Sequence, residues 1–76
     1  MEIPAEAVEN IERIVLKILY DEKAVKSTNL LVERVLAITF EEKIAISEKN
    51  IKLIINKMDQ EDKIQFSQKG GWKIKI

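Results

Sequence analysis

The chain has 76 residues, of which 46% are hydrophobic and 34% are charged, and its 13 basic side chains balance its 13 acidic ones. This length suits one domain near the lower size limit for unaided folding. The sequence contains no cysteine or histidine, which excludes disulfides, zinc sites built from those residues and catalysis by a histidine base.

The start of the chain and its hydropathy bear on where the protein is found. Residues Met1–Glu6 lack the basic start and the apolar core of a signal peptide. No apolar run approaches the roughly 20 residues that are needed to span a bilayer. We therefore expect a cytoplasmic protein that does not associate with membranes.

The first predicted element is a helix from Ala5 to about Asp21. Leu16 and Tyr20 lie about 140° to 180° around this helix from Ile11, which belongs to its apolar face. Two interpretations of this pair are open. Either the C-terminal strand or the second helix covers it, or it forms a stripe that binds a protein partner or a second copy of the chain. The apolar face itself contains Val8, Ile11, Ile14, Val15 and Ile18.

A second helix is predicted after the segment Lys26–Asn29, which contains three residues that can cap a helix. We expect this helix to end near Ile38 or Thr39. Its apolar residues are Leu31, Val32, Val35, Leu36 and Ile38.

The connection to the third helix has about seven residues, more than the three or four of a tight helix-turn-helix. Thr39 and Glu42 have the spacing of a capping box, which predicts one further turn of helix. Ile44 and Ile46 then alternate with a small residue. This alternation predicts a short extended segment that adds an edge to the C-terminal hairpin.

The third helix and the hairpin complete the predicted fold. Ser47 is the expected cap of a helix whose apolar residues are Ile51, Ile54, Ile55 and Met58. The period then changes to two, with Ile64 and Phe66 on one strand and Trp72, Ile74 and Ile76 on the next.

Ser67–Gly71 joins the two strands, and its paired glycines can take positive φ. Trp72 occupies an inward position of the last strand, and we expect it to pack against the first or the third helix. The sequence thus predicts a single domain, residues 1–76, of the α+β class. The fold is mostly helical, with three helices and a C-terminal β-hairpin.

The charges are unevenly distributed along the chain. Residues 1–46 carry six basic and nine acidic side chains, whereas residues 47–76 carry seven lysines and four acidic side chains, a net charge of +3. Lysine contacts phosphate or guanine, Asn and Gln read adenine, and Leu contacts the thymine methyl. The candidate DNA-binding residues are Lys49, Lys52, Leu53, Asn56 and Gln60 on the third helix and Gln68, Lys69, Lys73 and Lys75 on the hairpin. Two other interpretations are open, an ordinary polar helix face with one exposed leucine and a surface that binds a protein.

Nothing in the sequence favours an enzyme. Neighbouring carboxylates such as Glu41 and Glu42 diverge on a regular element, and the serines have only lysine as a base. Gly70 and Gly71 lack the pattern of a phosphate-binding loop. We expect no catalytic residues, no metal site and no cofactor.

The order of elements resembles the winged helix-turn-helix family from about Ala5 onward. The resemblance rests on Asn50–Met58, which leads into Lys63–Phe66, and on Gly71–Ile76 as the second strand. It implies that Ser47–Gln60 is a recognition helix, that Ser67–Gly71 is the wing, and that the partner is double-stranded DNA.

The function implied by this resemblance is transcription regulation, with the third helix in the major groove. Two alternatives stay open. The first is a winged helix that mediates protein interaction within a larger complex. The second is a subunit that dimerises through its first helix without touching nucleic acid.

Overall fold

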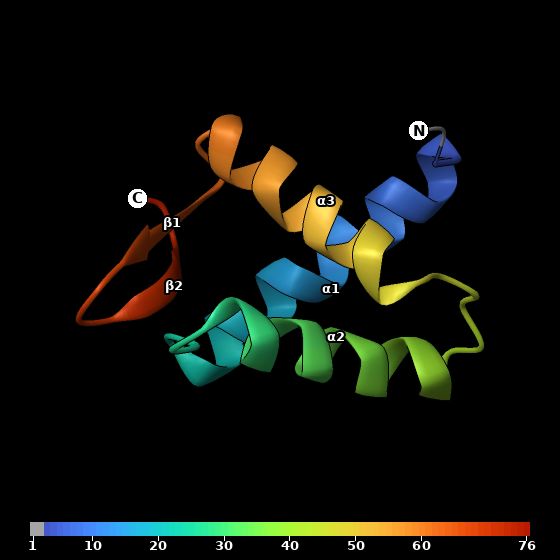
Figure 1. Ribbon diagram of the computed structural model, residues 1–76, viewed down its shortest axis with the longest axis horizontal. Helices are drawn as coiled ribbons and strands as arrows, with labels where there is room; N and C mark the ends of the chain where they lie inside the picture. Colours follow the sequence, from blue (N-terminus) through green and yellow to red (C-terminus); the bar gives the residue numbers. More distant parts are fainter. Residues whose placement is uncertain (1–2) are drawn as a thin grey trace.

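The structure, a computed structural model, describes residues 3–76. It contains helices α1 (Ala5–Glu22), α2 (Thr28–Glu41) and α3 (Glu48–Gln60), followed by strands β1 (Ile64–Ser67) and β2 (Gly71–Ile74). The predicted fold of three helices and a C-terminal antiparallel hairpin is confirmed (Figure 1). Met1 and Glu2, the first residues of the segment compared with a signal peptide, lie outside the described residues. Among the helices described, none is both long and apolar enough to cross a bilayer.

Serine side chains start two of the helices as the sequence predicts. The Ser27 Oγ accepts a hydrogen bond from the Leu30 N–H at 3.1 Å, and the Ser47 Oγ accepts one from the Asn50 N–H at 3.2 Å. Each bond pairs one of the N–H groups that the first turn of a helix leaves free. The predicted cap Ser47 is confirmed, and Ser27 is the one of the three candidates that caps the second helix.

The end of α2 differs from the prediction. The helix continues to Glu41, and Thr39 is buried within it and donates from its Oγ1 to the Leu36 carbonyl at 3.0 Å. The predicted capping box and separate helical turn are therefore wrong. The helix ends only where Lys43 takes φ 58, which lets the Ile44 N–H reach the Thr39 carbonyl at 2.8 Å.

A third segment pairs with the two strands of the hairpin, but it is not the segment predicted from the sequence. Val25, between α1 and α2, donates its N–H to the Trp72 carbonyl at 3.0 Å, and the Trp72 N–H donates to the Val25 carbonyl at 2.7 Å. The predicted edge at Ile44 and Ile46 is wrong, because both residues lie in the α2–α3 loop with their side chains packed on the core. Gly71 makes the Val25 pairing sterically feasible, since a Cβ there would collide with the backbone of the α1–α2 connection.

The core forms where the three helices and β2 meet. The predicted apolar face of α3 is confirmed, and all four of its residues are buried. Sequence reasoning missed Leu19, which is 1% exposed. Leu19 is buried because α1 contacts α2, α3 and β2, so its apolar face is wider than the face expected of a helix packed on one side.

Trp72 is buried as predicted, at 4% exposure, and the helices in contact with its strand are α1 and α2. Its indole N–H donates to the Thr28 Oγ1, at the start of α2, at 3.0 Å. Its ring also lies 5.2 Å from that of Phe66 between centroids. Phe66 remains 48% exposed, so the predicted burial of one side of β1 holds only at Ile64.

Candidate nucleic-acid interface

The exposed side of α3 brings five of the predicted residues together. Lys49, Asn56 and Gln60 are exposed, Leu53 is 41% exposed, and Lys52 is partly buried. With a rise of 1.5 Å per residue, this α3 stripe runs for about 16 Å from Lys49 to Gln60. Its members recur at helical spacing, so they share one face, with no carboxylate at its centre and with Glu48 and Asp59 towards its edges. The stripe thus gathers two lysines, two amides and one leucine on one helix face.

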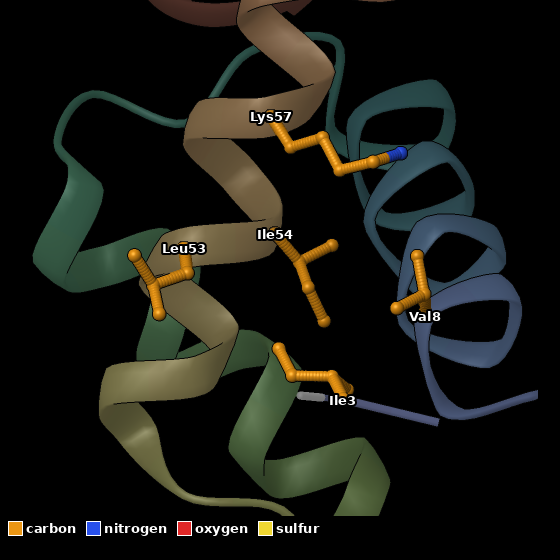
Figure 2. Close-up of a pocket in the computed structure, with 5 residues that line it drawn as sticks. All are labelled: Ile3, Val8, Leu53, Ile54 and Lys57. Carbon is orange, nitrogen blue, oxygen red and sulfur yellow. The ribbon is translucent and has the colours of Figure 1, made fainter. Parts of the chain in front are cut away.

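Leu53 also lines an apolar hollow between α3 and the start of α1. The hollow has a volume of about 330 Å³ and is lined by Ile3, Val8, Leu53, Ile54 and Lys57. In Figure 2, Ile54 points from α3 towards Ile3 and Val8, and the Lys57 side chain extends towards α1. The only charged group in this lining is the Lys57 amine, which is already engaged with Glu12 and Glu61. Among the described residues, the hollow thus offers no unpaired polar group that would orient a ligand.

A closed ring of ion pairs holds two of the C-terminal lysines. The Lys63 Nζ lies 2.8 Å from one Glu12 oxygen and 3.3 Å from Glu61, and the Lys57 Nζ lies 3.0 Å from Glu61 and 3.4 Å from Glu12. The Glu12 side chain is only 15% exposed, which places this carboxylate at the boundary of the core. The ring fastens α1 to the end of α3 and to the start of β1.

The same ring shifts three pKa values. The hydrogen bond to Glu61 is the main cause of the raised pKa of Lys57, and the hydrogen bond to Glu12 is the main cause of the raised pKa of Lys63. The pKa of Glu61 falls below its usual 4.5, chiefly because Lys57 donates to it. The ring contains two lysines and two glutamates, with Glu12 as the fourth member, so its formal charges cancel.

Ion pairing also limits two of the predicted contacts. Lys75 pairs with Asp62 at 3.1 Å, and Lys52 approaches Glu48 at 3.9 Å. Lys49, Lys69 and Lys73 have no ion pair with the residues that the structure describes. The net charge of +3 counted from the sequence is therefore not spread over one face, and the accessible cations fall into two groups, at the start of α3 and on the hairpin.

Sequence reasoning missed Lys26 as a member of the hairpin group. The Val25–Trp72 pairing brings the backbone of Lys26 against Gly71, while the end of the Lys73 side chain lies beside Gly70. Lys69 and Gln68 are exposed in the same turn. The hairpin tip lies beside the start of α2 and at the opposite end of the molecule from the start of α3 (Figure 1). Only the long-range pairing of Val25 brings the backbone of Lys26 next to the hairpin.

The pair Leu16 and Tyr20 separates in the structure. Leu16 is partly buried and packs on the core, whereas Tyr20 is 68% exposed with the Lys23 amine 5.1 Å from its ring centroid. A second, smaller hollow adjoins Tyr20, with a volume of about 210 Å³ and a lining formed by the end of α1 and by β2 and the residues after it. A partner stripe on α1 alone would therefore contain Tyr20 as its exposed member.

Comparisons with protein families, curated proteins and solved structures found no match to this chain.

No group of three or more acidic side chains within residues 3–76 is arranged to hold a metal ion. No buried side-chain nitrogen or oxygen in this part of the chain lacks a hydrogen-bond partner. Of the candidate residues predicted from the sequence, those that are exposed without an ion pair to another described residue include Asn56 and Gln60 on the α3 stripe, Lys49 at its start, and Lys69 and Lys73 on the hairpin.

Proposed function

We propose that this chain is a winged-helix protein that binds double-stranded DNA and acts as a transcription regulator. The observation that carries the proposal is the α3 stripe, an exposed helix face with Lys49, Asn56 and Gln60 and no carboxylate among its residues. Amide side chains read base edges in the major groove, and a flanking lysine neutralises phosphate. Lys49 supplies such a cation, because it has no ion pair with the described residues.

We expect the α3 stripe and the hairpin lysines to contact different parts of the DNA. Asn56 and Gln60 face the bases from the α3 stripe, and Lys49 contacts the backbone at the start of the helix. The hairpin group of Lys26, Lys69 and Lys73 contacts phosphates away from the α3 contact. The molecule is 32 Å long, close to the roughly 34 Å of one turn of duplex DNA.

The salt dependence of binding tests the number of phosphate contacts. Each neutralised phosphate contributes about 0.9 to the slope of log affinity against log salt concentration. Contacts by four lysines give a slope of about −3.6 on mixed-sequence duplex DNA. The measurement is a fluorescence anisotropy titration at several salt concentrations. Absence of binding at low salt, by protein shown to be folded, would refute the proposal.

Charge reversal at one lysine tests the placement of the surface. Lys49→Glu should weaken binding to every sequence and reduce the slope by about one unit. Lys17→Glu is the matched control, because Lys17 is exposed on α1, outside the α3 stripe, and the change in net charge is the same. Equal losses in the two variants would show that only the net charge matters and that the α3 stripe is not the contact.

Truncation of one amide tests base reading. Asn56→Ala should leave the salt slope unchanged and reduce the preference at one base pair, since Asn56 is exposed and carries no charge. The measurement is competition between duplexes randomised at single positions. A changed slope together with an unchanged preference would remove Asn56 from the set of base contacts.

A further inference from the structure

One edge of the hairpin is left open beside the end of α1. Ile64 lies opposite Ile74, and the Lys75 N–H donates to the Lys63 carbonyl at 3.2 Å. In an antiparallel ladder this makes Ile64 and Ile74 a pair without mutual hydrogen bonds. The N–H and C=O of Ile74 therefore point away from β1, to the side on which Trp72 pairs with Val25.

Nothing in the described chain continues that pairing past Val25. An antiparallel segment would place Lys23 opposite Ile74, but Lys23 has φ 71, and α1 ends there. Within residues 3–76, no hydrogen bond reaches the Ile74 backbone from this side. Val25 thus forms a one-residue strand, and the edge of β2 beside it is unpaired.

An apolar hollow lies at this open edge. Its volume is about 210 Å³, and its lining consists of Leu19, Tyr20, Lys23, Lys73, Ile74 and Ile76. Tyr20 is 68% exposed, although it is a large aromatic side chain on an otherwise well-packed helix. The space beside the free backbone groups of Ile74 is therefore suited to an apolar side chain.

The charged residues at the hollow favour an acidic partner. Both charged residues in its lining are lysines, Lys23 and Lys73. The nearby carboxylates of α1 do not line it, and one of them, Glu22, pairs with Arg34 at 3.4 Å. A second copy of the chain, added about a two-fold axis, would bring like charges together. An extended segment with carboxylates and one apolar side chain complements the lysines, the hollow and the open edge together.

We propose that an extended acidic segment of a partner protein adds to the sheet along the open edge of β2. Its backbone pairs with Ile74 in continuation of Val25, one of its apolar side chains fills the hollow beside Tyr20, and its carboxylates face Lys23 and Lys73. This surface lies apart from the α3 stripe and shares only Lys73 with the proposed DNA contacts. A DNA-bound molecule therefore keeps most of the surface accessible to the partner.

The probe is a synthetic eight-residue peptide of alternating valine and glutamate, titrated into the full chain by calorimetry and by nuclear magnetic resonance. Binding should shift the amide resonances of Ile74 and of the end of α1 and slow hydrogen exchange at Ile74. A peptide of alternating valine and lysine should bind at least tenfold more weakly. Loss of binding on methylating alternate peptide nitrogens would show that backbone pairing is required.

Two substitutions at one residue isolate the backbone group. Ile74→Pro removes the outward N–H but none of the hairpin bonds, because Ile74 makes no ladder bond to β1. Ile74→Ala is the matched control, with a shortened side chain and an intact N–H. The proline variant should bind the acidic peptide several-fold more weakly than the alanine variant.

Three results of the peptide experiments would overturn the proposal. They are no binding of the acidic peptide at millimolar concentration, equal binding by both Ile74 variants, or resonance shifts confined to the outer edge of β1. Self-association of the unmodified protein that Tyr20→Ser abolishes would also overturn it, because a second copy would then occupy the surface. If Ile74→Pro does not fold, the methylated peptide decides whether backbone pairing occurs.

Discussion

Truncation of Trp72 tests how the hairpin closes the core. Trp72 is 4% exposed, pairs its backbone with Val25, donates from its indole to Thr28 and packs on Phe66. Trp72→Ala removes the ring and leaves a cavity between β2 and the helices, at a cost of about 3–5 kcal/mol. A small domain has about 5–15 kcal/mol of stability in total, so this substitution consumes much of it.

The assay is thermal and urea unfolding followed by far-ultraviolet circular dichroism, which does not depend on the tryptophan. At about 4–8 °C per kcal/mol for a domain of this size, the melting temperature should fall by more than 10 °C. A melting temperature within a degree or two of the parent would refute this account of the core. It would show that the ring contributes little packing despite its burial.

A double-mutant cycle separates the indole hydrogen bond from the packing of the ring. Trp72→Phe removes the donor, and Thr28→Val removes the acceptor while keeping a similar shape. Thr28→Val leaves a buried indole N–H unpaired, which costs about 1–3 kcal/mol. The coupling between the two changes should be about 0.5–1.5 kcal/mol, and additivity would mean that the 3.0 Å contact contributes no energy.

Three further predictions follow from the helix ends, the hairpin and the ring of ion pairs. The pKa of Glu61 is lower in the folded protein than its usual 4.5, so Glu61 contributes stability above about pH 4.5 that is lost as the pH falls through its folded-state pKa. Glu61→Gln should therefore reduce the loss of stability at acid pH. Lys43 ends α2 with φ 58, a left-handed conformation that is unfavourable for residues other than glycine. Lys43→Gly should therefore raise the melting temperature by a few degrees, and a lower melting temperature would contradict this reasoning. Gly71→Ala should destabilise by at least about 1–2 kcal/mol, since φ is 78 and the new Cβ meets the Val25 carbonyl. Gly70→Ala, which meets mainly the flexible end of a lysine side chain, should cost far less in the same urea titration.

The sequence alone predicted the elements whose causes are local. Ser47 caps α3 through the N–H of Asn50, and the helical spacing of its apolar residues correctly gave the buried face of α3. The alternation around Trp72 predicted the hairpin, because successive side chains on a strand point to opposite faces. The five residues of the α3 stripe were predicted to share a face by the same periodicity.

Tertiary structure alone decided which distant groups meet. Val25 is a single residue between two helices, so it shows no alternation, and only the missing Cβ of Gly71 lets it pair with Trp72. That pairing places Lys26 at the hairpin and leaves the edge beside Ile74 open.

The ion pairs depend on tertiary structure in the same way. Glu12 meets Lys63 across 51 positions of sequence, and a count of charges along the chain does not identify such partners. The sequence therefore determined how many cations the C-terminal half carries. The packing of α1 against α3 and β1 decided which of them remain accessible, because a charge held in a ring of ion pairs is no longer available to phosphate.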